Sequence, residues 1–547
     1  MAGQTASPNH QPLVFANGMA SGDTVTLSMA YEVDLTPTPD IYFLQSTNYN
    51  YQLENFLFPF GRTNPFHPGY GELPPVMAGR DRLKRDLKIR MKAVKVKKTR
   101  PTAITLTGPR GCGKTALLKW IAGEARESNM PVVTMASENL SSVEAIARGM
   151  ARKFPRNLLE RVSGIKLNVG DFGAGFDLAE VSRVAGAEDM SSWLEALGSG
   201  NTGGVLLLDE AHNMPPEVGH IFYNAAQTVG KDYPLLLVIA GTPDLPSVLA
   251  RSGATFIERG RMERIGRLDR DDTRQALFKP FGRWVRFNDD AMEHVLDEVQ
   301  DYPYFIQLWR SALWDTLARN RTFRPGMDMV DAARKTVDEQ RLELYNRRVE
   351  ELNNSRLLVP FAEMAWRVGE GGQPTSRDFN LALQHLSPHQ GFDDREQLEV
   401  RQKLLHTGFV WEPLVGIWEY GIPSLASYVR RNAVDFLLER LEEQGLVEAL
   451  QTIAKCFGPP QRQPMVKARI DLDKALTLNK SGYDPLASFL AMKLLGPVQD
   501  SGQIRLRAPH LVRATVTEAI RRELLTKPEP DEETEFSPPT SSFEPRM

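Results

Sequence analysis

The sequence predicts an α/β fold built on a parallel sheet in its first half, followed by helical regions in its second half. Two observations predict this arrangement. Four short apolar runs lie at 103–107, 131–135, 204–208 and 234–241, which is the pattern of strands covered on both faces. The stretches between these runs have a helical pattern, and strands that alternate with helices form parallel sheets.

The run GPRGCGKT at 108–115 directly follows the first apolar run and precedes a helical stretch. It fits the pattern G-x-x-x-x-G-K-[ST] at every fixed position. Glycines let successive backbone N–H groups face phosphate oxygens, and the start of a helix adds a favourable dipole. In such loops the lysine reaches the β- and γ-phosphates and the threonine hydroxyl is a ligand of Mg²⁺. We therefore predict a P-loop NTPase core. The residues expected to bind the cofactors ATP and Mg²⁺ are Gly108, Pro109, Arg110, Gly111, Cys112, Gly113, Lys114, Thr115 and Ala116.

A second motif, GGVLLLDEAHNM at 203–214, places two carboxylates at the end of an apolar run. Asp209 is then expected to hold Mg²⁺ together with Thr115. Glu210 is expected to polarise the attacking water as a general base. An ordinary acidic pair at a strand end is the alternative. The pair follows the phosphate-binding loop with one predicted strand between them, and this position favours the catalytic interpretation.

Thr242 follows the last of the four apolar runs. A hydroxyl at this strand end can contact the γ-phosphate or orient the attacking water, so we predict that Thr242 is a catalytic sensor. The sequence Gly-Thr-Pro-Asp at this position is also typical of a turn, and that alternative stays open.

The phosphate-binding loop, the acidic strand end and the polar strand tip together resemble those of the AAA+ ATPases. The resemblance is greatest to the origin-recognition-like group and to the related signal-transduction ATPases, and it covers about residues 76–430. The segment VMAGRDRL at 76–83 is similar to the one that opens such domains. This similarity implies that Val76 and Met77 pack on the adenine.

The segment DYPYFIQLW at 301–309 is similar to the lid motif of the same ATPases, which implies that Pro303 faces the base or the ribose. The origin-recognition group usually has an arginine here, where this chain has Pro303 and Tyr304. This departure brings the chain closer to the signalling ATPases.

The segment FIERGRMERIGRL at 256–268 is rich in arginine. The resemblance implies an arginine finger here, which would reach the γ-phosphate of a neighbouring subunit and require self-association. Arg259 is the first candidate, followed by Arg264 and Arg267. Solvated surface arginines are the alternative.

Length and composition exclude several classes of protein. The 547 residues carry a net charge of −3, so no overall basic field indicates nucleic-acid binding. The two cysteines, Cys112 and Cys456, exclude a disulfide scaffold and favour a reducing compartment. The sequence shows neither an apolar run of membrane-spanning length nor a signal peptide, so we expect a cytoplasmic protein without a membrane partner.

The region 355–432 is predicted to be a winged helix, because helical stretches at 357–366, 376–386 and 395–408 precede a short apolar hairpin. A further hairpin is expected at 166–178. The predicted domains are an extended, partly disordered segment 1–75, a nucleotide-binding core 76–267, a helical lid 268–350, the winged helix 355–432, a mostly helical region 433–525 and a disordered acidic tail 526–547.

Charge is distributed unevenly along the chain. Residues 80–100 hold eleven Lys/Arg against two Asp, whereas 355–432 holds eight Lys/Arg against nine Asp/Glu. Any DNA binding is therefore expected through 80–100 rather than through the winged helix, although a solvated helix is the alternative.

The function predicted from these motifs is Mg²⁺-dependent ATP hydrolysis coupled to conformational change or assembly, in a DNA-associated, defence or mobile-element complex. The alternative is an ATP-binding scaffold with little turnover that recruits protein partners through the winged helix and the C-terminal region. An intact lysine and acidic pair favour turnover.

Overall fold

The structure is a computed structural model of the chain. The residues that it describes are 24–26, 50–52, 64–69, 71–96, 102–154, 187–254, 260–282, 285–354, 357–369, 372–378, 380, 394–443, 495–498, 504–506 and 509–524.

A five-stranded parallel sheet forms the centre of the first half of the chain, as expected. Its strands, in the order β4-β5-β6-β3-β7, are β4 (Val132–Met135), β5 (Gly204–Leu208), β6 (Leu235–Gly241), β3 (Thr102–Thr107) and β7 (Arg261–Arg264). All residues of β5 and β6 are buried, because both faces of the sheet are covered. The α/β prediction is therefore confirmed, with four strands where the apolar runs placed them.

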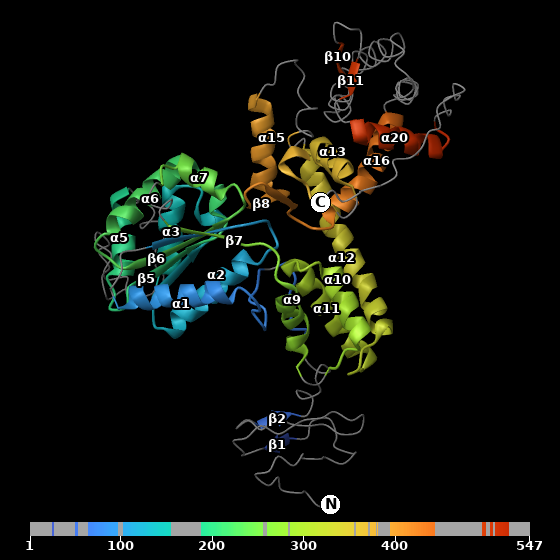
Figure 1. Cartoon of the computed structure of the whole chain (residues 1–547). Coiled ribbons are helices and arrows are strands. Elements are labelled where there is room, and N and C mark those ends of the chain that lie inside the picture. Colours follow the sequence, from blue (N-terminus) through green and yellow to red (C-terminus); the bar gives the residue numbers. More distant parts are fainter. Residues whose placement is uncertain are drawn as a thin grey trace, which may run out of the picture. The chain divides into compact units, whose positions relative to one another are not determined.

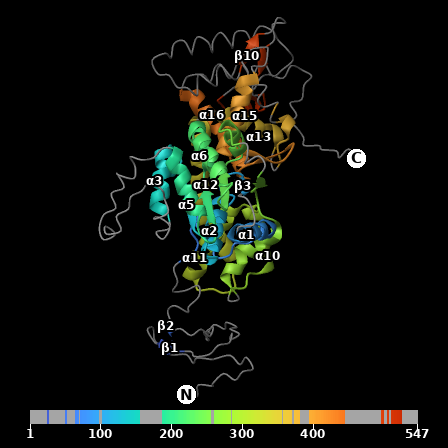
Figure 2. The ribbon, with the colours of Figure 1, turned by 90° about the vertical axis from the view of Figure 1, so that its left-hand side faces the viewer.

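Helices cover both faces of this sheet (Figure 1). On one face lie α1 (Asp81–Lys95) and α2 (Lys114–Glu127), and on the other lie α3 (Val143–Lys153), α5 (Ala187–Gly198) and α6 (Pro216–Val229). In the perpendicular view of Figure 2, α3 and α5 lie side by side. The second face packs a core whose large side chains include Ile146, Met150, Met190, Trp193, Leu194, Phe222 and Tyr223.

Strand β7 was not predicted from the sequence. Its residues, RMER, carry three charges, and its burial alternates between half-buried and exposed positions. The strand lies at the edge of the sheet and pairs only with β3, so one side faces solvent and tolerates charge.

The chain after β6 is mainly helical. The helices are α7 (Leu245–Arg251), α9 (Arg270–Phe278), α10 (Asp289–Val299), α11 (Pro303–Asn320) and α12 (Met327–Asn354). Helix α11 contributes large fully buried side chains, among them Phe305, Trp309 and Arg310. The Arg310 guanidinium donates to the Ala276 carbonyl oxygen at 2.8 Å and lies over the Phe66 ring, and its burial lowers its pKa to about 9.

Contacts within the chain divide it into two compact units. The first comprises residues 1–344, 402–415 and 419–423, and the second comprises 345–401, 416–418 and 424–547.

In the second unit, α13 (Leu358–Val368), α16 (Leu425–Glu443) and α20 (Pro509–Arg521) pack on one another. The fully buried Glu363 accepts hydrogen bonds from the Leu511 backbone N–H at 2.9 Å and from His510 Nδ1 at 2.8 Å. A carboxylate at this position satisfies free N–H groups at the start of α20.

The described chain also contains helix α15 (Asp394–Thr407) and three two-stranded sheets. Helix α15 is followed by the two-stranded sheet of β8 (Val410–Leu414) and β9 (Ile417–Tyr420). Strand β10 (Leu495–Val498) pairs with β11 (Ile504–Leu506), and β1 (Thr24–Thr26) pairs with β2 (Asn50–Gln52). Within the described residues, no helix is both long enough and apolar enough to cross a bilayer.

Several predictions concern residues outside the described part of the chain. They are the hairpin at 166–178, the tail 526–547, and most of 1–75, of 376–386 and of 433–525. Because the central helix of the predicted winged helix falls mainly among these residues, the winged helix stays a prediction.

Candidate nucleotide-binding site

The loop between β3 and α2 has the backbone that its glycines permit. Gly111 and Gly113 have φ angles of 80° and 85°, in the region where a side chain is strained. A Cβ at Gly108 would overlap the carbonyl oxygen of Ile265, so this position also requires glycine. The loop ends at Lys114, the first residue of α2, and its backbone therefore meets the start of that helix.

Lys114 lies over this loop. Its Nζ donates to the carbonyl oxygens of Gly108 at 2.8 Å and of Pro109 at 2.6 Å. Desolvation holds the pKa of Lys114 below its ordinary value, although nearby acidic groups, among them Asp209 and Glu210, oppose the shift. The ammonium group is thus held at the loop by carbonyl oxygens with which phosphate oxygens can compete.

The structure brings Thr115 and Asp209 together from two different strand ends. The Thr115 hydroxyl donates to Asp209 Oδ2 at 2.7 Å, and the Glu210 backbone N–H donates to Asp209 Oδ1 at 3.0 Å. Asp209 is buried, with 8% of its surface exposed. A hydroxyl and a carboxylate side by side are oxygen donors of the kind that Mg²⁺ prefers.

Glu210 differs from Asp209 in its exposure and its backbone. Its side chain is exposed, and its φ angle of 51° lies in the left-handed region that is uncommon for a residue with a side chain. It begins the short helix η4 (Ala211–Asn213), which turns the chain directly after β5. This turn presents one carboxylate to solvent beside a second, buried one.

Two buried polar atoms at the end of β6, Thr242 Oγ1 and Asp244 Oδ1, make no hydrogen bond with any described residue. Thr242 is 1% exposed, and Asp244 is also buried. A buried polar atom that lacks a partner is costly, so a ligand oxygen or water at this point would be stabilised.

His212, on η4, connects the two strand ends. Its Nδ1 accepts the backbone N–H of Thr242 at 3.4 Å, which places the ring proton on Nε2 in the neutral ring. Nε2 is buried and has no partner among the described residues. Desolvation, followed by the positive groups His406, Arg110 and Lys114, lowers the pKa of His212 to about 3.

His406, from the end of α15, packs on this cluster. Its ring centroid lies 5.2 Å from that of His212, and its Nδ1 lies 3.4 Å from Asp244 Oδ2. Residues 402–415 belong to the same unit as the sheet, and Gly408 lies against Pro109 and Arg110 of the phosphate-binding loop.

The start of α11 also contacts the loop. The Tyr302 hydroxyl donates to the Arg110 carbonyl oxygen at 2.6 Å, and a Cβ at Gly111 would overlap that hydroxyl. A Cβ at Gly113 would lie 3.8 Å from Cβ of Pro303. Pro303 is thus next to the loop, as its predicted role in nucleotide binding requires.

The segment that precedes α1 lies along the same loop. A Cβ at Gly71 would lie 2.8 Å from Cγ2 of Thr115. Arg80 Nη2 donates to the carbonyl oxygens of Cys112 and Gly266, both at 2.8 Å. Val76 and Met77, which lie between Gly71 and Arg80 in the sequence, are half-buried.

The arginine candidates have different positions. Arg259 lies outside the described residues. Arg264 donates to the Pro413 carbonyl oxygen at 3.2 Å, and Arg267 Nε lies 4.0 Å from a carboxylate oxygen of Glu419. Both described arginines are therefore engaged within their own unit.

Burial raises the pKa of the Cys112 thiol, so this residue fits a packing position rather than a reactive one. Sequence reasoning overlooked the roles of His212 and Tyr302. The only local signal was the position of His212 two residues after the acidic pair.

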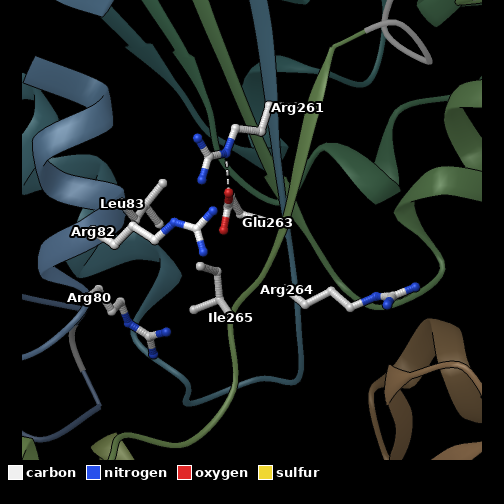
Figure 3. Close-up of a pocket in the computed structure, with 7 residues that line it drawn as sticks. All are labelled: Arg80, Arg82, Leu83, Arg261, Glu263, Arg264 and Ile265. Carbon is white, nitrogen blue, oxygen red and sulfur yellow. Dashed lines mark hydrogen bonds and ion pairs between the residues drawn. The ribbon is translucent and has the colours of Figure 1, made fainter. Parts of the chain in front are cut away.

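A separate cavity of about 290 Å³ lies between the start of α1 and β7. Figure 3 shows the side chains of Arg82 and Arg261 directed toward Glu263, while Arg264 points away from them. Arg80 lies at the edge of the same cavity.

Comparisons with known proteins agree with this architecture. A family model described as an AAA domain matches residues 97–249, which include the phosphate-binding loop, the acidic pair and Thr242. No curated protein matches the chain.

Among solved structures, the chain is similar to the RuvB Holliday junction branch migration motor of Thermotoga maritima. The identity is 17% and the TM-score 0.35, over 64% of this chain and 95% of that chain. It is also similar to Cdc6p from Pyrobaculum aerophilum, at 15% identity and a TM-score of 0.37, over 67% of this chain and 97% of that chain.

A third similar structure is the Aeropyrum pernix ORC1 protein in complex with DNA, at 15% identity and a TM-score of 0.35. The match covers 68% of this chain and 96% of that chain. At these identities and TM-scores the structural likeness does not identify an activity. Residues 97–249 match the AAA domain model, and they lie within an α/β fold of the P-loop NTPase type.

Proposed function

We propose that this protein binds ATP with Mg²⁺ and hydrolyses it, and that hydrolysis drives a conformational change or an assembly step. The observation that carries the proposal is the hydrogen bond between Thr115 and Asp209, which joins the phosphate-binding loop to the end of β5. Two oxygen donors next to a lysine and a glycine-rich loop match the requirements of a nucleotide phosphate with its metal ion.

The residues present fit both groups. Thr115 and Asp209 supply hard oxygen ligands for Mg²⁺, which when bound would neutralise charge on the β- and γ-phosphates. Lys114 would exchange its loop carbonyl partners for phosphate oxygens. Val76, Met77 and Pro303 are the proposed contacts of the base and ribose.

The proposed catalytic groups divide the chemistry between them. The exposed carboxylate of Glu210 accepts the proton of the attacking water. The Thr242 hydroxyl, which is buried and makes no hydrogen bond with any described residue, orients that water or contacts the γ-phosphate. Arg259 of a neighbouring subunit would stabilise charge in the transition state, which makes activity depend on self-association.

DNA is the second proposed partner, through the basic stretch 80–100 of an otherwise slightly acidic chain. An ATP-binding scaffold with little turnover is the alternative function. The exposed Glu210, next to the buried Asp209, supports turnover, because a scaffold has no need of a general base at this position.

Steady-state phosphate release by the purified full-length chain tests the proposal, with and without DNA and with Mg²⁺ or EDTA. We expect Mg²⁺-dependent turnover. Tight ATP binding without turnover under any of these conditions would favour the scaffold.

A further inference from the structure

Three exposed cations of α1 lie on one face of the helix. Arg82, Arg85 and Lys92 are exposed and make no hydrogen bond or ion pair with any described residue, whereas three other cations of α1 pair with carboxylates at 2.7 to 2.8 Å. Two large apolar side chains, Ile89 and Val96, are 65% and 57% exposed. These five residues are here called the basic face of α1.

Their spacing shows why they form one face. The numbers 82, 85, 89, 92 and 96 follow the i, i+3, i+7 pattern of a helical stripe. The buried residues Leu83, Leu87, Met91 and Val94 occupy the opposite side. From Arg82 to Lys92 the face extends about 15 Å, at about 1.5 Å per residue.

The cavity beside β7 lies at the beginning of this face. Arg82 and Arg261 both line it, around Glu263 (Figure 3). Arg261 is hydrogen-bonded to Glu263 and lies 2.9 Å from Asp86, so its charge is already compensated. Arg80 and Arg264 donate to backbone carbonyl oxygens, whereas Arg82 makes no hydrogen bond or ion pair with any described residue.

Arg80 connects the cavity with the nucleotide site. It lines the cavity, and its Nη2 donates to the Cys112 carbonyl oxygen in the phosphate-binding loop. An anion in the cavity that attracts this guanidinium group would therefore change its hydrogen bond with the backbone of that loop. Burial lowers the pKa of Arg80, and the nearby Asp272 and Asp269 oppose that shift only in part.

We propose that the basic face of α1 binds a nucleic-acid strand, with one phosphate group in the cavity at Arg82 and Arg80. The next phosphates of the strand lie along Arg85 and Lys92, and the exposed Ile89 and Val96 contact sugars or bases. The flat guanidinium group suits a phosphate, and phosphate contacts are independent of sequence. The link from Arg80 to the phosphate-binding loop rests on the proposed function and couples strand binding to ATP.

The test of binding uses the full-length chain and a fluorescein-labelled oligonucleotide, single-stranded or duplex, in a salt series followed by anisotropy. Arg82→Ala should weaken binding about 5-fold or more and lower the salt slope by about 1, as expected for one lost phosphate contact. The matched control is Arg148→Ala, which removes an exposed charge on α3 that makes no hydrogen bond or ion pair with the residues that the structure describes.

Equal losses in the Arg82→Ala and Arg148→Ala variants would overturn the proposal, because only net charge would then matter. Polyglutamate that competes as strongly as the oligonucleotide would assign the face to an acidic protein instead. Inorganic phosphate that displaces the strand at concentrations where sulfate does not would assign the cavity to a small phosphate compound.

The coupling is tested separately with a fluorescent ATP analogue and Mg²⁺. Saturating oligonucleotide should change the Kd of the analogue about 5-fold, and linkage requires the reciprocal change. Arg80→Lys keeps a positive charge but loses the forked donor that reaches the Cys112 carbonyl oxygen. The effect of the strand on the Kd of the analogue should therefore disappear, even at oligonucleotide concentrations that saturate the variant. A chain that binds the analogue but no strand refutes this inference alone, whereas one that binds the strand but no analogue refutes the proposed nucleotide site.

Discussion

His212 offers the sharpest prediction outside the residues that the motifs predict. Its ring accepts the Thr242 backbone N–H and so holds the tip of β6 next to the turn that carries Glu210. His212→Ala would leave that buried N–H without a partner, at a cost of about 1–3 kcal/mol. If the end of β6 relaxes so that this N–H finds a new partner, the Thr242 hydroxyl moves with it. A loss of about 1–3 kcal/mol of transition-state stabilisation would then lower kcat about 5- to 150-fold.

The assay compares kcat and nucleotide affinity in two variants. The affinity of His212→Ala for Mg²⁺–ATP should stay within about twofold, because Lys114 and Thr115 donate to Gly108, Pro109 and Asp209 and not to His212. His212→Asn should restore most of kcat, because its side-chain oxygen can accept the same N–H. Equal kcat in the Ala variant and the wild type would refute the reasoning.

The pH dependence of stability gives a second check on His212. Its folded pKa of about 3 lies below its ordinary value of 6.5, so the unfolded chain binds the proton more readily. The neutral ring therefore contributes its full stability above pH 6.5, and that contribution falls as the pH drops toward 3, by about 2 kcal/mol at pH 5. Chemical denaturation at pH 7 and pH 5 should show this loss in the wild type and a smaller one in His212→Asn.

Three further predictions follow from other contacts. Lys114→Ala should abolish ATP binding in calorimetry while the fold persists, and unchanged affinity would contradict the loop assignment. Specific activity should rise with protein concentration and flatten in Arg259→Ala, since a finger supplied by a neighbour contributes on the order of 10³-fold; activity independent of concentration would indicate a monomeric enzyme. Glu363→Ala should destabilise the start of α20 by about 1–3 kcal/mol, because the Leu511 N–H and His510 lose their acceptor. Hydrogen exchange at residues 509–524 should be faster in this variant and less affected in Glu363→Gln. Equal exchange in the wild type and both variants would contradict the capping role.

The features that sequence reasoning predicted are local in the chain. The phosphate-binding loop, its flanking strand and helix, and the acidic end of β5 each have their signal within about a dozen residues, because glycine conformation and strand burial are local properties. The meeting of Thr115 with Asp209 follows from strands that are parallel and end at the same edge of the sheet.

The features that it missed depend on contacts between distant residues or on edge positions. Tyr302 reaches Arg110 over a separation of 192 residues, and no local pattern marks a tyrosine as a partner of a loop carbonyl. The same holds for the packing of Gly408 on that loop. Strand β7 escaped notice because an edge strand needs no apolar run.

The central claim, that Glu210 is the base of an active ATPase, is tested most directly by Glu210→Gln. The account predicts that the wild type releases phosphate with Mg²⁺, and that the variant binds a fluorescent ATP analogue with unchanged affinity but turns over about 10²-fold more slowly or less. Equal turnover by wild type and variant, or ATP binding by the wild type with no turnover at all, would contradict it.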